Sequence, residues 1–203
     1  MSKEWKGNSK SFSVMLGAST TWHPEQRAAG DYYTTDPEAV KQFLNVFPIA
    51  KESVIWEPAC GCENISKVLE EAGYNVYSTD LYNRGYGISG IDFLQTKKTP
   101  EKCSLIMTNP PYSLADDFIL HALDILPAGG RVVFLLNLSY LCGIKRYKEI
   151  YSNRYLESVY IYPHRINCYK NNTPTDHHSP VNYGWFVFKN KRSLLERPKI
   201  YWI

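Results

Sequence analysis

The chain has 203 residues, of which 44% are hydrophobic and 21% charged, so it is neither a disordered nor a fibrous polypeptide and can bury one sizeable core. We therefore expect one domain over residues 1–203. No apolar run approaches the roughly 18 residues of a membrane span, and the start Met1-Ser-Lys-Glu-Trp-Lys lacks the layout of a secretion signal. These features favour a cytoplasmic protein.

The net charge of +3 hides an asymmetry between the two parts of the chain. Residues 1–140 carry 12 Lys and Arg against 16 Asp and Glu, whereas residues 141–203 carry 11 against 4. The basic part is also rich in tyrosine, a combination that can follow phosphates and stack on bases. A solvated face with tyrosines in the core explains it equally well.

The predicted elements begin after an N-terminal arm, residues 1–30, which is polar and expected to be loosely ordered. A helix should start at Asp36-Pro37, because Asp36 suits the N-cap and Pro37 the first helical position, and Pro48 should end it. Further helices are expected at about 64–72, 114–126 and 144–153. Apolar runs predict strands at 53–56, 75–80, 105–108, 131–138, 158–162 and 182–188.

This alternation of strands and helices predicts an α/β protein with a doubly wound, mostly parallel sheet. No helix separates the last two strands, so the late strand should be antiparallel. Residues 163–181 should then form a long loop, and long loops in compact domains are often functional.

Polar groups at the ends of parallel strands are the candidate site, because ligands bind beyond the carboxyl ends of such strands. The turn Glu57-Pro58-Ala59-Cys60-Gly61 follows one strand, and Gly61 would let the backbone approach a ligand. Asp80 ends the next strand and suits a carboxylate that accepts both ribose hydroxyls of a nucleoside. Each feature alone is also common in turns and helix caps.

The most informative motif is Asn109-Pro110-Pro111-Tyr112, which follows the strand at 105–108. Two consecutive prolines donate no backbone hydrogen bond and hold their carbonyls in a fixed arrangement. The Asn109 amide and the Pro110 carbonyl could accept both hydrogens of an –NH₂ group, while Tyr112 stacks on the ring that carries it. A simple Pro-Pro stop before a helix is the alternative.

In this order, the segment Asp31-Tyr-Tyr-Thr-Thr35, the turn at 57–61, Asp80, Asp92-Phe93 and Asn109-Pro-Pro-Tyr112 resemble the amino-methyltransferases that modify adenine in DNA, particularly small solitary enzymes of phages and prophages. The resemblance covers roughly residues 30–190. It implies a seven-stranded Rossmann-like methyltransferase sheet and S-adenosylmethionine as cofactor.

The resemblance also implies the roles of particular residues. The cofactor would contact the residues Tyr33, Thr34, Glu57, Pro58, Ala59, Cys60, Gly61, Asp80, Asp92 and Phe93. The target base would be held by Asn109, Pro110, Pro111 and Tyr112, and no metal is required. Asn109 is neutral and cannot act as a general base, so it would position and polarise the amino group.

Two features depart from the family pattern. Glu63 stands where a second glycine is usual, so that a carboxylate enters the cofactor turn, and we expect no separate recognition domain after the core. Methylation of adenine in RNA or of a glutamine amide in a protein therefore remains open. So does a nucleic-acid-binding protein that keeps the fold without catalysis.

Overall fold

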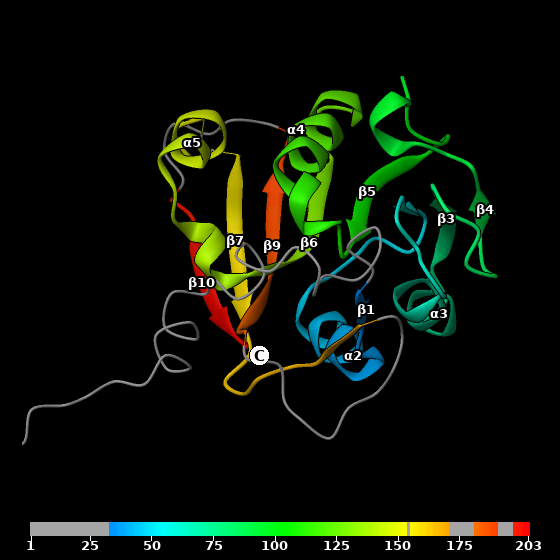
Figure 1. The fold of residues 1–203 in the computed structure, drawn as a ribbon, viewed down its shortest axis with the longest axis horizontal. Coiled ribbons are helices and arrows are strands. Elements are labelled where there is room, and N and C mark those ends of the chain that lie inside the picture. Colours follow the sequence, from blue (N-terminus) through cyan, green and yellow to red (C-terminus); the bar gives the residue numbers. More distant parts are fainter. Residues whose placement is uncertain (1–32, 154, 171–180, 191–196) are drawn as a thin grey trace, which may run out of the picture.

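A computed structural model describes residues 33–153, 155–170, 181–190 and 197–203 (Figure 1). The predicted N-terminal arm, most of the segment 163–181 and the basic residues Lys191 and Arg192 lie outside these ranges. Within them, no helix has both the length and the apolar character required to cross a membrane.

The core of the molecule is a sheet with the strand order β10-β7-β9-β6-β5-β2-β3-β4. Strand β9 runs antiparallel to both of its neighbours, and all other adjacent strands are parallel. The strands are β2 (Val54–Glu57), β3 (Asn75–Asp80), β4 (Ile88–Ser89), β5 (Cys103–Thr108), β6 (Arg131–Asn137), β7 (Leu156–Ile161), β9 (Tyr183–Lys189) and β10 (Lys199–Trp202). The predicted α/β fold class with a late antiparallel strand is confirmed.

The sheet has eight strands rather than the seven expected. The two strands that no apolar run predicted, β4 and β10, form its two edges, where they pair with one neighbour each. All of their residues are exposed, and Trp202 retains 70% of its surface. Edge strands of this kind lack the buried residues on which pattern recognition depends.

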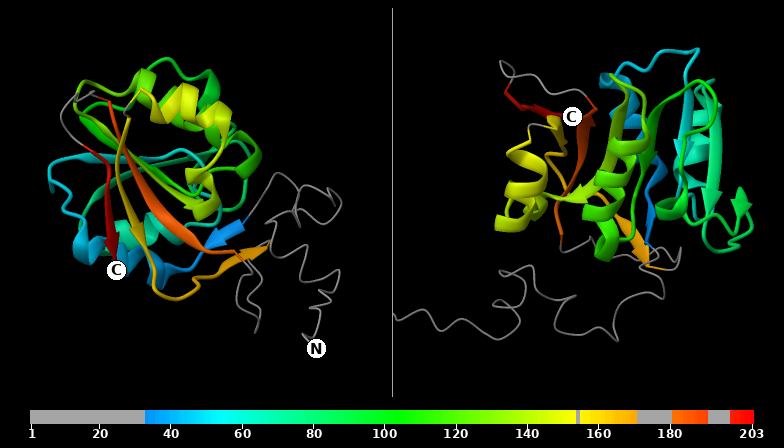
Figure 2. Two further views of the ribbon diagram at one scale, coloured as in Figure 1. Left: turned by 90° about the vertical axis from the view of Figure 1, so that its left-hand side faces the viewer. Right: turned by 90° about the horizontal axis from the view of Figure 1, so that it is seen from above.

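Helices cover both faces of the sheet (Figure 2). Helices α2 (Pro37–Val46) and α3 (Asn64–Glu71) pack on one face, where Phe43 and Leu69 join Trp185 of β9 in one buried cluster. Helix α4 (Ala115–Ile125) packs on the other, with Ile119 against residues of β5 and β6 such as Phe134. The central strands are therefore buried on both sides, as their near-continuous apolar runs require.

Local signals account for several element boundaries. The Asp36 side chain accepts a hydrogen bond from the Glu38 amide at 2.9 Å, so Asp36 is the N-cap of α2 as predicted. Three further segments form short 3₁₀ turns: η3 (Phe93–Gln95), η4 (Tyr112–Leu114) and η5 (Leu138–Leu141). The helix expected at 144–153 consists of one α-turn, α5 (Ile144–Arg146), and a π-helical turn, η6 (Tyr147–Tyr151).

A small ribbon stands apart from the main sheet (Figure 2). Its strands β1 (Tyr33–Thr35) and β8 (Cys168–Lys170) pair antiparallel over three residues each. Part of the segment expected to be a loop is thus a strand. Its partner lies some 135 residues earlier in the chain, so no local pattern could reveal the pairing.

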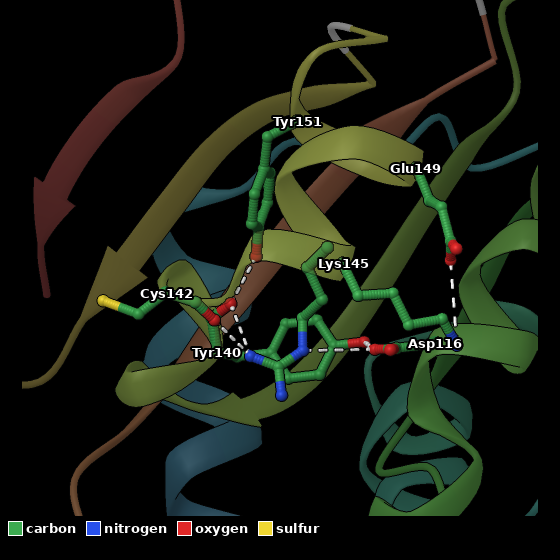
Figure 3. A network of polar contacts seen from close by, with 7 residues as sticks. Asp116, Tyr140, Cys142, Lys145, Glu149 and Tyr151 are labelled. Atoms are coloured by element: carbon green, nitrogen blue, oxygen red, sulfur yellow. Dashed lines mark hydrogen bonds and ion pairs between the residues drawn. The ribbon is translucent and has the colours of Figure 1, made fainter.

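A polar network connects α5 and η6 to the start of α4 (Figure 3). The Tyr140 hydroxyl donates to Asp116, and Arg146 Nε lies 3.3 Å from the same carboxylate. Arg146 also donates to the carbonyls of Tyr140 and Cys142, and the Tyr151 hydroxyl donates to the Tyr140 carbonyl at 2.6 Å. The Arg146 guanidinium is therefore engaged in contacts within the fold, where it connects the residues around η5 to α4.

Candidate active site

A cavity of about 390 Å³ opens at the carboxyl ends of β2, β3 and β5, within the size range of small-molecule sites. Two residues of the Asn-Pro-Pro-Tyr motif line it, Asn109 and Pro111. All ten predicted cofactor contacts line it as well: Tyr33, Thr34, Glu57, Pro58, Ala59, Cys60, Gly61, Asp80, Asp92 and Phe93. The structure thus brings together segments that are spread over 79 positions of the chain.

Asp80 joins the ends of two adjacent strands. Its Oδ2 accepts a hydrogen bond from the Gly61 amide at 2.9 Å, and its Oδ1 accepts one from the Tyr82 amide at 2.8 Å. Gly61 has φ +55°, a conformation that favours glycine and turns its amide toward the carboxylate. Each oxygen of Asp80 keeps a lone pair for a ligand hydroxyl, because a carboxylate oxygen can accept two hydrogen bonds.

Glu57 is the most deeply buried acid at the cavity, with 1% of its surface exposed. Burial raises its pKa to about 8, although a hydrogen bond from Ser66 Oγ opposes the shift. The Ser66 hydroxyl is also 2.6 Å from the Ser78 hydroxyl on β3. Glu57 therefore carries a proton near neutral pH and anchors α3 to the sheet.

Glu63 departs from the family pattern but stays out of the cavity. Its backbone φ is +92°, in the left-handed region, where the side chain of any residue other than glycine causes a steric penalty. Its carboxylate forms an ion pair with Lys67 at 2.7 Å on the surface of α3, and the cavity wall does not include it. The substitution thus strains the turn without placing a charge beside the ligand.

Asp92 and Phe93 form another part of the wall. Asp92 caps η3 by accepting a hydrogen bond from the Leu94 amide at 3.0 Å. The ring of Phe93 packs edge-on against Trp56 at 5.1 Å, and it packs against Phe118 at 4.9 Å with the two rings tilted by 44°. This support fixes an apolar surface beside a carboxylate, a combination suited to a heteroaromatic ring.

Asn109 holds a defined orientation. Its Nδ2 donates to the Tyr33 carbonyl at 2.9 Å, which identifies the other end of the amide as the oxygen. Oδ1 is buried and has no hydrogen-bond partner among the described residues; Thr35 Oγ1, also at the cavity wall, is in the same state. Unpaired buried polar atoms are costly, so both atoms are candidates for contacts with a ligand.

Tyr112 does not line the cavity, and neither does Pro110. The Tyr112 ring stacks on Tyr33 at 5.5 Å and on Tyr183 at 6.0 Å, and its hydroxyl donates to the Tyr183 hydroxyl at 3.2 Å. Burial raises its pKa well above the usual value. The structure thus shows this ring packed between protein groups rather than open for a base.

Several further residues of the wall were not identified from the sequence. Thr35 belongs to the segment 31–35 that carries the resemblance but was not among the predicted cofactor contacts. Asn64 donates from the first turn of α3 to the Thr35 carbonyl at 2.8 Å. Arg84 and Tyr82 follow Asp80, with the Arg84 guanidinium 5.2 Å from the Tyr82 ring. Tyr82 and Arg84 could have been found only as polar or aromatic residues that closely follow a strand end. Such residues are common in loops, so their position alone does not identify them as part of a site.

No protein-family model and no curated protein sequence matches the chain. Among solved structures it is similar to a Listeria monocytogenes protein assigned to the class I S-adenosylmethionine-dependent methyltransferases, with 13% identity and a TM-score of 0.58 over 93% of this chain and 70% of that one. It is also similar to a type I restriction-modification methyltransferase subunit from Streptococcus thermophilus, with 13% identity and a TM-score of 0.54 over 89% and 50%.

A third similar structure is an S-adenosylmethionine-dependent O-methyltransferase from Thermotoga maritima, with 11% identity and a TM-score of 0.51 over 86% and 71%. The chain thus spans half the length of the restriction-modification subunit. At these identities the similarity establishes the fold, a Rossmann-like methyltransferase fold.

The raised pKa of Glu57 predicts a pH-dependent stability. The folded protein holds this proton up to about pH 8, whereas the unfolded chain releases it near pH 4.5. The free energy of unfolding should therefore fall as pH rises across this interval, by on the order of 1 kcal/mol per pH unit. Glu57→Gln should flatten the slope in urea denaturation series without ligand.

Glu63→Gln is the matched control for this series, because it removes a half-buried carboxylate at the protein surface and should keep the wild-type slope. Equal slopes in wild-type protein and Glu57→Gln would contradict the assignment of the proton to Glu57.

The left-handed backbone at Glu63 predicts an unusual response to glycine. Glu63→Gly should be more stable than Glu63→Ala by about 1 kcal/mol, because alanine keeps the steric conflict and glycine removes it. Lys67, in the middle of α3 and exposed, is the control: there glycine should be less stable than alanine by about 1 kcal/mol. Thermal or urea unfolding of the four variants measures both differences, and the same sign at both positions would refute strain at Glu63.

Proposed function

We propose that this protein is an S-adenosylmethionine-dependent methyltransferase that acts on the exocyclic amino nitrogen of adenine in DNA. The observation that carries the proposal is the Asn109 amide beside a cavity built from the predicted cofactor contacts: its oxygen is buried, oriented and without a partner among the residues that the structure describes. An acceptor without a donor at this place fits a ligand that brings an amino group.

The cavity suits S-adenosylmethionine by the chemistry of its walls. Asp80 offers lone pairs to two ribose hydroxyls, and Phe93 offers an apolar surface with Asp92 beside it for an amino-substituted ring. Gly61 lines the cavity at the turn before α3, and the Thr35 hydroxyl has no partner among the described residues. When bound there, the cofactor supplies an electrophilic methyl group on a sulfonium.

The residues of this chain would then bind and orient the acceptor. Asn109 Oδ1 and the Pro110 carbonyl accept hydrogen bonds from the amino group, which favours a pyramidal and more nucleophilic nitrogen as charge develops. Because Asn109 is neutral, it does not remove the proton. The nitrogen would become cationic as the S–CH₃ bond breaks, and it would release one proton to water after the transfer. Alignment of nitrogen and methyl group for in-line displacement supplies the remaining acceleration.

DNA is the preferred acceptor for two reasons. The chain shares its fold with a restriction-modification methyltransferase subunit, and its C-terminal part is strongly basic. Adenine in RNA and a glutamine amide present the same –NH₂ group and are the competing acceptors. Incubation with labelled cofactor and DNA, RNA or protein, followed by identification of the modified nucleoside or residue, decides among them.

The role of Asn109 can be tested by turnover. Asn109→Ala should fold and bind cofactor but lose at least two orders of magnitude in turnover, about 3 kcal/mol of preorganised polar stabilisation. Methyl transfer at saturating cofactor measures the loss. Asn137→Ala is the control, because this amide ends the adjacent strand β6 but lies outside the cavity wall; it should keep most of the activity, and similar losses in both variants would remove Asn109 from catalysis.

The role of Asp80 can be tested by binding. Asp80→Asn keeps the shape of the side chain but loses the charge that favours hydroxyl donors, so the affinity for S-adenosylmethionine should fall at least tenfold, or about 1.4 kcal/mol. Isothermal titration calorimetry gives the dissociation constant. Asp36→Asn, at the cap of α2, is the control and should bind normally; an unchanged affinity in Asp80→Asn would exclude Asp80 from the ribose site.

A further inference from the structure

Tyr33 contacts both functional groups of the Asn-Pro-Pro-Tyr motif. Its backbone carbonyl accepts the hydrogen bond from Asn109 Nδ2 at 2.9 Å, and its ring stacks on Tyr112 at 5.5 Å with an interplanar angle of 29°. Tyr33 also lines the cavity, whereas Tyr112 does not. One residue of the small ribbon thus sets the orientation of the amide and covers the aromatic ring.

The two rings that stack on Tyr112 differ in how firmly the fold holds them. Tyr183 belongs to β9, which is paired along both edges, and only 7% of its surface is exposed. Tyr33 belongs to β1, which pairs with β8 over three residues and has no place in the main sheet. If a ring leaves Tyr112, the one that can do so at low cost is Tyr33.

The hydrogen bonds that hold β1 in place involve the backbone of the strand and of Asp36, which follows it. The Thr35 carbonyl accepts from Asn64, and the Asp36 amide donates to the Asn167 carbonyl at 3.3 Å. The Tyr33 carbonyl is held by Asn109. Rotation of the Tyr33 side chain therefore requires none of these hydrogen bonds to break, so the amide can stay oriented while the ring moves.

We infer that, in the free protein, the Tyr33 ring occupies the place of the acceptor base and covers the face of Tyr112 on which the base stacks. When the base enters, the ring rotates away from Tyr112. The Tyr33 carbonyl continues to position Asn109 throughout. This inference rests on the proposed function and specifies the acceptor further. A base replaces the lost stack with one of its own, because stacking depends on a π-face that every base has. A glutamine amide has no ring with which to replace it.

The displacement can be observed directly in the full chain. The probe is 3-fluorotyrosine in place of Tyr33, followed by fluorine NMR with S-adenosylhomocysteine bound. A short single-stranded oligothymidine that carries one adenine should shift the resonance from the value of a stacked ring to that of an exposed one. The matched strand, with an abasic site in place of the adenine, should bind through its phosphates and leave the resonance unchanged.

Kinetics provide a second readout that a purely structural role would not move. The KM of the adenine strand should be at least about threefold lower for Tyr33→Ala than for Tyr33→Phe at saturating cofactor, because removing the ring abolishes the competition for Tyr112. A higher KM for Tyr33→Ala would overturn the inference, since Tyr33 would then be part of the surface that holds the base.

Binding of the strands and displacement of the Tyr33 ring are measured separately. An adenine strand that binds, as measured by fluorescence anisotropy, but leaves the fluorine resonance unmoved overturns the inference about Tyr33 and leaves the proposed function standing. A protein that binds neither strand overturns both.

Discussion

The candidate site depends on the two backbone hydrogen bonds that the carboxylate of Asp80 accepts. By accepting hydrogen bonds from the Gly61 and Tyr82 amides, it ties the turn after β2 to the end of β3 and fixes the distance between them. Two neutral groups could not hold these amides as firmly, because a charged acceptor makes the stronger hydrogen bond. The parallel register of β2, β3 and β5 then places Asn109 at the same edge of the sheet.

Much of this arrangement could be predicted from the sequence because it depends on local patterns. Apolar runs identified the six central strands, and Asp36-Pro37 identified the start of α2. The edge strands β4 and β10 carry no such pattern, and β1 and β8 become strands only through their mutual pairing. A strand that forms only through long-range pairing carries no local sequence pattern. Such strands could therefore not be predicted from patterns of neighbouring residues.

The same distinction applies within the site. Every predicted cofactor contact lines the cavity, and those in the turn 57–61 and at Asp80 do so because strand ends and the turns after them are fixed by topology. The environment of Tyr112 is different: it depends on the rings of Tyr33 and Tyr183, which come from the beginning and the end of the described chain. The Glu63 side chain is a similar case, since its direction follows from a left-handed backbone that the residue type itself disfavours.

The ion pair between Arg146 and Asp116 also changes how the basic part of the chain acts at a distance. A guanidinium paired with a carboxylate 3.3 Å away forms a dipole, whose field decays faster than that of a free charge. Beyond one Debye length, about 8 Å at physiological salt, such a pair contributes almost nothing to the attraction of a polyanion. Lys145 is likewise paired with Glu149 at 3.8 Å, and Lys189 with Glu157 at 4.0 Å. A distant polyanion would therefore be attracted by fewer free cations than the composition suggests.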